Sequence, residues 1–248
     1  MGQDVHDGRG IELFDADSPR AGELLRELHD EVLRPSFRPE EYVSPQTISP
    51  SGHLTLIACD DGGQVTGGAL GEVYPASGVM LLGYLAVRPG LRGAGVGSVL
   101  LTALRERWLG QQSLAFLELD DPRHHAADPV RGDPEARLRF YARSGIRLLA
   151  IPYFQPRLRG DLPRGYHMFL GVIPPKGVIL PPVMPTQRVT TFLREYFEAC
   201  EGAGSHADPE VSWLLDAVGG PEITLIHPRE FSRAPETMPP PGAPEGRE

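Results

Sequence analysis

The stretch from Leu81 to Leu104 constrains the fold of this 248-residue chain more than any other part of the sequence. It begins with an apolar run that predicts a buried strand, which stops where Pro89-Gly90 follows. A glycine-rich turn comes next and leads into a helix, because apolar residues recur at helical spacing from Val96 onward. A strand, a glycine turn and a helix in this order direct several backbone amides at one spot, where an anion such as a pyrophosphate binds.

Three anion-binding motifs share this outline, and two of them do not match the residues. The P-loop needs a lysine followed by serine or threonine after its last glycine, and this turn has no lysine. The dinucleotide motif needs G-x-G-x-x-G, whereas this turn has G-x-G-x-G followed by Ser98. What remains is the pattern R-G-A-G-V-G from Arg92 to Gly97, after the strand end L-A-V-R-P. A purely structural turn is the alternative that this motif alone leaves open.

This pattern resembles motif A of the GNAT acyltransferase superfamily, whose members are N-acetyltransferases that bind acetyl-coenzyme A. The glycines and the arginine of the turn match the family signature R/Q-x-x-G-x-G/A. A second family hallmark, F-Y-x-x-x-G-F, has a counterpart that starts at Phe140-Tyr141 and ends at Gly145-Ile146, with isoleucine in place of the usual aromatic residue. The resemblance covers roughly residues 10–175 and implies the fold of that family.

The other sequence patterns supply the remaining elements of such a fold. They predict strands at 11–14, 53–59, 64–74, 113–120, 146–155 and 165–173, and helices at 19–33 and 133–144. Ser18-Pro19 is expected to open the first helix. We expect the strand at 113–120 to pair in parallel with the strand at 81–87, because the helix between them forms a crossover. The fold class is therefore α/β (α+β), with a mixed central sheet flanked by helices and a C-terminal helical extension.

Three regions are predicted along the chain. They are a GNAT acetyltransferase domain at 10–175, a C-terminal extension at 176–228 and a proline-rich tail at 229–248. The prolines of 174–185 predict a linker, and the extension carries the patterns of two helices, the second opened by Asp208-Pro209, and a short strand at 223–226. The tail has few apolar residues, so we expect it to be disordered unless it docks.

Composition and charge exclude several classes of function. The net charge of −9 argues against a general nucleic-acid-binding surface, which needs a basic patch. The first ten residues lack the pattern of a signal peptide, and no apolar run reaches membrane length. Cys59 and Cys200 have no metal-ligand spacing, and His124-His125 lies in a polar loop that matches no known metal site. We expect a cytoplasmic protein without a metal, a nucleic-acid partner or a membrane partner; a homodimer is left open.

The resemblance implies that acetyl-CoA is the co-substrate and that backbone groups hold it. Amides of the glycine turn would donate to the pyrophosphate at the positive end of the helix. The strand before the turn would pair with the pantetheine arm, and an amide near Leu85 or Ala86 would polarise the thioester carbonyl. The predicted coenzyme-binding residues are Leu85, Ala86, Val87, Arg92, Gly93, Ala94, Gly95, Val96, Gly97 and Ser98.

The catalytic candidates are one tyrosine and three carboxylates. Tyr141 stands where the family's tyrosine commonly acts as general acid toward the coenzyme sulfur; a packed aromatic side chain is the alternative. Glu72, Glu118 and Asp120 lie on predicted strands and are candidate bases, which would take the proton of the acceptor amine directly or through water. A base is not strictly required, because some amines arrive neutral.

Three segments are candidates for the acceptor side. In GNAT-like proteins the region of 34–52 forms one wall of the acceptor pocket, and the strand that carries Tyr153–Pro156 faces it. An ordinary strand end explains Tyr153–Pro156 equally well, and the arginines of 157–164 suggest an anionic substrate. The leading hypothesis is an acetyl-CoA-dependent N-acetyltransferase that transfers acetyl directly to an unidentified amine. The alternatives are a non-catalytic acyl-CoA-binding or regulatory module, and an interaction protein built on the extension.

Overall fold

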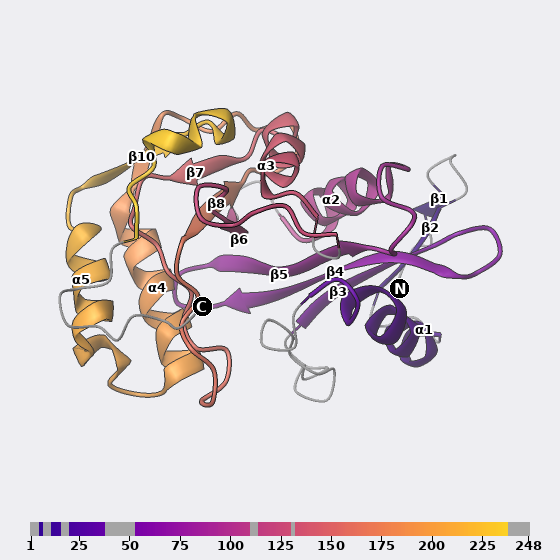
Figure 1. Cartoon of the computed structure of the whole chain (residues 1–248), viewed down its shortest axis with the longest axis horizontal. Helices are drawn as coiled ribbons and strands as arrows, with labels where there is room; N and C mark the ends of the chain where they lie inside the picture. Colours follow the sequence, from indigo (N-terminus) through magenta and orange to yellow (C-terminus); the bar gives the residue numbers. More distant parts are fainter. Residues whose placement is uncertain are drawn as a thin grey trace. The chain divides into compact units, whose positions relative to one another are not determined.

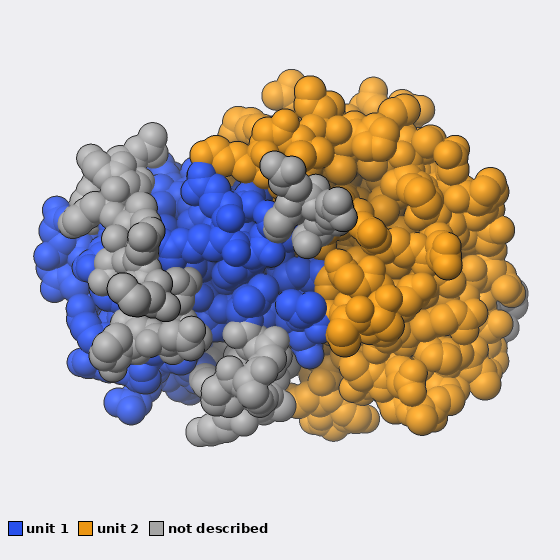
Figure 2. All heavy atoms as spheres, turned by 180° about the vertical axis from the view of Figure 1, so that it is seen from behind, with its two compact units in different colours: residues 1–73, 80–113, 129–131 blue, residues 74–79, 114–128, 132–248 orange. Residues whose placement is uncertain are grey.

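The chain folds into two compact units that are interleaved along the sequence. The computed structural model describes residues 5–6, 11–15, 20–37, 53–109, 114–129 and 132–237. Unit 1 contains residues 1–73, 80–113 and 129–131, and unit 2 contains residues 74–79, 114–128 and 132–248 (Figure 2). Over the described ranges, no helix is long and apolar enough to span a membrane.

Unit 1 is built on a sheet whose strands follow the order of the chain, β1-β2-β3-β4-β5. These are β1 (Val5–His6), β2 (Glu12–Asp15), β3 (His53–Cys59), β4 (Val65–Tyr74) and β5 (Val79–Val87). The pairs β1–β2, β2–β3 and β3–β4 are antiparallel. At the β3–β4 hairpin the Asp60 carboxylate accepts the amides of Gly62 and Gln64, at 2.9 and 3.0 Å. The predicted strand at 53–59 and the turn after it are confirmed.

Helices cover both faces of this sheet, and two adjacent glycines of β4 show why. A Cβ built on Gly67 would lie 3.0 Å from Val96 of helix α2 (Val96–Arg107), and one on Gly68 would lie 2.5 Å from Leu28. Successive residues of a strand point to opposite faces, so α2 covers one face of the sheet and Leu28 covers the other. Figure 1 shows helices on both sides of these strands. The helices approach this closely because both positions lack a side chain.

The first helix is predicted correctly as a helix but not in its form. It begins as α1 (Ala21–Glu27) and continues as a π-helical segment, η1 (Leu28–Leu33), where the Arg34 amide donates to the His29 carbonyl at 2.9 Å. Periodicity at 3.6 residues does not foresee this wider turn. The predicted cap Ser18-Pro19, and residues 38–52 of the predicted pocket wall, lie outside the described residues.

Unit 2 has a second antiparallel arrangement of strands in the order β6-β8-β7-β10-β9. Its strands are β6 (Leu114–Asp120), β7 (Arg147–Leu149), β8 (Met168–Ile173), β9 (Val183–Pro185) and β10 (Glu222–Ile226). Its helices are α3 (Pro134–Arg143), α4 (Thr186–Glu201) and α5 (Pro209–Ala217). Asp133 and Asp208 cap α3 and α5 with their side chains, as the Asp-Pro sequences predict.

Three predictions for this unit need correction. The predicted strand at 146–155 forms regular strand over Arg147–Leu149 alone. The predicted linker contains β9, because its residues 183–185 pair with β10. The predicted tail is docked through residue 237: a 3₁₀ segment, η3, covers Pro228–Arg233, and the buried Thr237 hydroxyl donates to the Tyr153 carbonyl. The low hydrophobicity of this segment does not predict its docking, because the docking depends on hydrogen bonds to residues far away in the sequence.

The predicted domains and the predicted parallel pair stay predictions. The strand at 81–87 lies in unit 1 and the strand at 114–120 lies in unit 2. The two units of the structure are not divided at residue 175 or at residue 228, where the predicted domains are divided. Strand β10 of the predicted extension pairs with β7 of the predicted domain, Leu225 opposite Leu149.

A buried arginine ties the second half of unit 2 together. The Arg164 side chain is 2% exposed and forms ion pairs with Glu201, Asp208 and Glu210 at 2.6, 2.8 and 2.7 Å. It also lies over the ring of Phe154, 5.4 Å from its centroid. Burial works against ionised carboxylates, but Arg164 holds the pKa values of Glu201 and Asp208 below their usual range. This arginine therefore neutralises acidic groups of its own unit, and the expectation of an anionic substrate there is not supported.

We predict that Arg164→Met destabilises the protein strongly. Removing one partner of a buried ion network leaves uncompensated buried charges, which costs roughly 3–5 kcal/mol. Urea unfolding at neutral pH measures this loss. Arg159→Met is the control, because Arg159 and Asp161 form an exposed pair at 3.4 Å that contributes little. A loss no larger than that of the control would contradict the prediction.

Candidate functional site

The turn between β5 and α2 has the backbone that a pyrophosphate site requires. Gly93 and Gly95 have φ angles of 90° and 93°, in the left-handed region that favours glycine. Gly95 is the N-cap of α2, and its carbonyl accepts the amides of Ser98 and Val99 at 3.0 and 3.1 Å. The amides of Val96 and Gly97 precede these first helical bonds, so they point out of the positive end of the helix.

A half-buried arginine fixes the end of β5, directly before this turn. The Arg88 side chain donates through Nε to the Val65 carbonyl and through Nη2 to Glu27, both at 2.6 Å. Glu27 also accepts the Val65 amide at 3.0 Å, so α1, β4 and β5 meet in one group. Sequence patterns do not predict this group, because Glu27, Val65 and Arg88 lie far apart in the chain.

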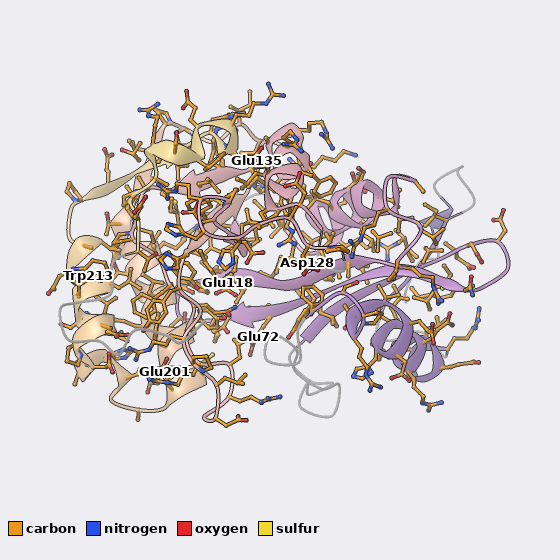
Figure 3. All side chains as sticks on the ribbon, in the orientation of Figure 1. Glu72, Glu118, Asp128, Glu135, Glu201 and Trp213 are labelled. Atoms are coloured by element: carbon orange, nitrogen blue, oxygen red, sulfur yellow. The ribbon has the colours of Figure 1, made fainter. Side chains whose placement is uncertain are left out.

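Glu118 on β6 is surrounded by neutral hydrogen-bond donors, all of them from unit 2. Tyr153 donates to Oε1, and the Gln155 amide donates to Oε2 at 2.6 Å. The Tyr196 hydroxyl lies 3.3 and 3.2 Å from the two oxygens. Within the part of the chain that the structure describes, no arginine, lysine or histidine forms an ion pair with this carboxylate, and Glu118 as a whole residue is half-buried. Figure 3 labels Glu118 among these side chains.

Burial raises the pKa of Glu118, and the hydrogen bonds from Tyr153, Gln155 and Tyr196 offset this rise in part. A carboxylate with a raised pKa is a stronger base than one in water. The predicted segment Tyr153–Pro156 therefore contributes two donors to a candidate base. Tyr196 was missed, because its place in the apolar stripe of α4 predicts a packed aromatic residue and nothing more.

The other two candidate bases have different surroundings. Asp120 forms an ion pair with Arg137 of α3 at 2.9 Å, so its charge is already matched. Glu72 is exposed on β4 in unit 1. Of the three carboxylates, Glu118 alone combines enclosure with neutral donors in the described structure.

Tyr141 lies on α3 and is buried, with 6% of its surface exposed. Burial raises the pKa of its hydroxyl to about 12, so the side chain is protonated at neutral pH, which is the form that a general acid needs. Its role toward the coenzyme stays a prediction. In the pair His124-His125, the ring of His124 stacks on that of His167 with ring centroids 4.0 Å apart. No three His, Cys, Asp or Glu among the described residues are grouped to hold a metal ion.

A strand, a left-handed glycine turn and a helix N-terminus form an anion-binding arrangement that occurs in several classes of α/β folds. A sequence model of the Acetyltransferase (GNAT) family matches residues 22–145, which is half of the chain, so the chain belongs to this family. A search of the curated proteins finds no match.

Several solved structures are similar to part of this chain. A Bacteroides thetaiotaomicron protein described as a GNAT acetyltransferase is 22% identical, with a TM-score of 0.50 over 66% of this chain and 86% of that chain. A Lactobacillus plantarum protein described as an N-acetyltransferase is 18% identical, with a TM-score of 0.46 over 66% and 97%. An aminoglycoside 6'-N-acetyltransferase complexed with coenzyme A is 18% identical, with a TM-score of 0.45 over 65% and 94%. The predicted fold class, a central sheet flanked by helices, is confirmed.

We predict that Glu118→Gln stabilises the protein at pH 8. The folded-state pKa of Glu118 is raised, so its contribution to stability is fully present below the unfolded value of about 4.3 and is lost as pH rises through the folded pKa. Glutamine stays neutral, so its advantage in unfolding free energy should shrink as the pH is lowered toward about 4.3.

The control is Glu201→Gln, followed by urea unfolding at the same pH values. Because Arg164 lowers the pKa of Glu201, its ionised form stabilises the fold, and this variant should be less stable than the wild type at pH 8. A stability difference between Glu118→Gln and the wild type that does not shift in favour of the variant between about pH 4.3 and pH 8 would contradict the raised pKa of Glu118.

Proposed function

We propose that this chain is an N-acetyltransferase that uses acetyl-CoA and transfers the acetyl group directly to an amine. One observation carries the proposal: the turn after β5 holds Gly93 and Gly95 at positive φ and ends at the N-terminus of α2. Membership of the GNAT family supports an acyl-CoA donor. A cytoplasmic location and the absence of nucleic-acid and membrane partners stay predictions.

Backbone groups of the turn are proposed to hold the pyrophosphate. A hydrogen bond to a charged group contributes roughly 1.5–3 kcal/mol, so a few amides give useful affinity without a lysine. The proposed coenzyme-binding residues remain Leu85, Ala86, Val87, Arg92, Gly93, Ala94, Gly95, Val96, Gly97 and Ser98. The first three belong to β5 and are proposed for the pantetheine arm and the thioester.

Acetyl-CoA supplies an activated thioester, and the protein's residues are proposed to manage the protons and the developing charge. The acceptor nitrogen must be neutral to add to the carbonyl carbon, so Glu118 is proposed to take its proton. An amide near Leu85 or Ala86 is proposed to donate to the oxygen that becomes negative. When the carbon–sulfur bond breaks, Tyr141 is proposed to give its hydroxyl proton to the departing thiolate.

We predict that Gly95→Ala weakens the binding of coenzyme A by tenfold or more, measured by isothermal titration calorimetry. The new methyl group stands where the phosphates approach the backbone, and tenfold corresponds to about 1.4 kcal/mol, close to one charge-assisted hydrogen bond. Gly90→Ala is a matched control, because Gly90 has a φ of 89° and its Cβ would meet no atom within 4 Å.

Both variants place alanine in the left-handed region, so both should lose a similar roughly 1–2 kcal/mol of stability. Only Gly95→Ala should lose affinity. Equal losses of affinity in the two variants would show that strain in the loop, rather than contact with phosphate, explains the effect, and wild-type protein that binds no coenzyme A would refute the donor site.

We predict that Tyr141→Phe lowers kcat by about 10²-fold or more and leaves the affinity for coenzyme A unchanged, because a general acid acts on the leaving sulfur and not on binding. The assay is steady-state turnover with the amine that a screen identifies. Tyr166→Phe is the control, since it removes a hydroxyl that donates to Glu210 at 2.6 Å. Unchanged turnover would remove Tyr141 from the mechanism. Coenzyme binding without turnover of any amine would favour the non-catalytic acyl-CoA-binding module.

A further inference from the structure

We propose that Tyr196, on α4 of the C-terminal extension, completes the site that receives the acceptor, holding the Glu118 carboxylate for a primary ammonium group. The proposal rests on the proposed function, because it names the class of acceptor that the transferase would use. Tyr196 lies beyond residue 145, where the match to the family ends, so the contribution belongs to this chain's own extension.

The protein does not fill every hydrogen-bond acceptor site of the Glu118 carboxylate. An ionised carboxylate has about four acceptor sites. Three neutral donors occupy the site around Glu118, from Tyr153, Gln155 and Tyr196. One acceptor position therefore remains for a ligand, and Glu118 as a whole residue is half-buried.

The Glu118 carboxylate also lacks a positively charged partner among the described residues. Enclosed carboxylates in proteins are normally paired with a cation, because an unpaired charge away from water is costly. The donors around Glu118 are all neutral, and the described residues supply no cation to it. An ammonium group brings both the missing positive charge and an N–H donor for the remaining acceptor position. An anionic ligand would meet repulsion at the same place.

Tyr196 is tightly packed, with 3% of its surface exposed. Its ring stacks on Phe192 with centroids 5.5 Å apart and meets Tyr74, a residue of unit 2, edge-on at 5.6 Å. The neighbouring Glu195 accepts the amides of Ala76 and Ser77, both at 2.7 Å, which fixes α4 against the turn after Tyr74. Packing thus sets the position of the hydroxyl before any ligand binds.

Tyr196 is therefore a positioning residue for Glu118, and it acts through the carboxylate. Its hydroxyl donates to the charged form, which counteracts the effect of burial on the pKa of Glu118. The other titratable groups that influence Tyr196 are Tyr153, Cys200 and Tyr74. Removing the hydroxyl should leave the carboxylate less charged near neutral pH and less able to hold an ammonium group.

The test is a ¹³C NMR titration of the Glu118 side-chain carboxyl in the full chain, assigned by its loss in Glu118→Gln. In Tyr196→Phe the titration midpoint should move upward by about one pH unit, the effect of losing one hydrogen bond to a charged group. Tyr166→Phe is matched to it, because Tyr166 also donates to a glutamate, Glu210, and should leave Glu118 unchanged. Gln155→Leu removes a second donor and should move the midpoint in the same direction.

Ethylammonium chloride is the ligand probe in the same experiment. It should shift the Glu118 carboxyl signal of the wild type in a saturable way, several-fold more weakly in Tyr196→Phe, whereas propionate should not. A midpoint in Tyr196→Phe equal to that of the wild type, or a saturable response to propionate alone, would overturn the proposal. Neither measurement involves coenzyme A, so a failure of the donor site would leave these results unchanged.

Discussion

An enclosed carboxylate without a cation is the constraint on which the arrangement of unit 2 depends. Burial works against the charged form of Glu118, and the donors that offset this come from two places: Tyr153 and Gln155 after β7, and Tyr196 on α4. The Thr237 hydroxyl holds the Tyr153 backbone, and Arg164 joins the ends of α4 and α5. The predicted extension and tail are thus tied to the same few residues as the candidate base.

The donor and acceptor sides of the proposed reaction use different kinds of chemical group in the chain. On the donor side, the groups are backbone amides, and glycines at positive φ are what make them available. On the acceptor side, the groups are side chains whose protonation depends on their surroundings, as burial and neutral donors at Glu118 show. Arg88, directly before the glycine turn, anchors the end of β5 through Val65 and Glu27, which lie far from it in the sequence.

Local signals in the sequence predicted the local structure well. The strand at 53–59, the glycine turn before α2 and the Asp-Pro caps of α3 and α5 all depend on residues near one another in the chain. The strand β9, the docked Thr237 and the Tyr196–Glu118 contact depend on partners dozens of residues away, which periodicity does not encode. The family resemblance pointed to the turn that is proposed to bind the coenzyme, but it ended before Tyr196, which is proposed to complete the Glu118 site.

The most direct test of the central claim is a mass-spectrometric screen in which the purified chain and acetyl-CoA are incubated with a panel of primary amines, each compared with an anionic analogue of similar size. The account predicts that at least one cationic amine gains a single acetyl group, with an equal amount of free coenzyme A, and that Glu118→Gln abolishes this product. Coenzyme A released by hydrolysis alone, with every amine unchanged, would contradict it.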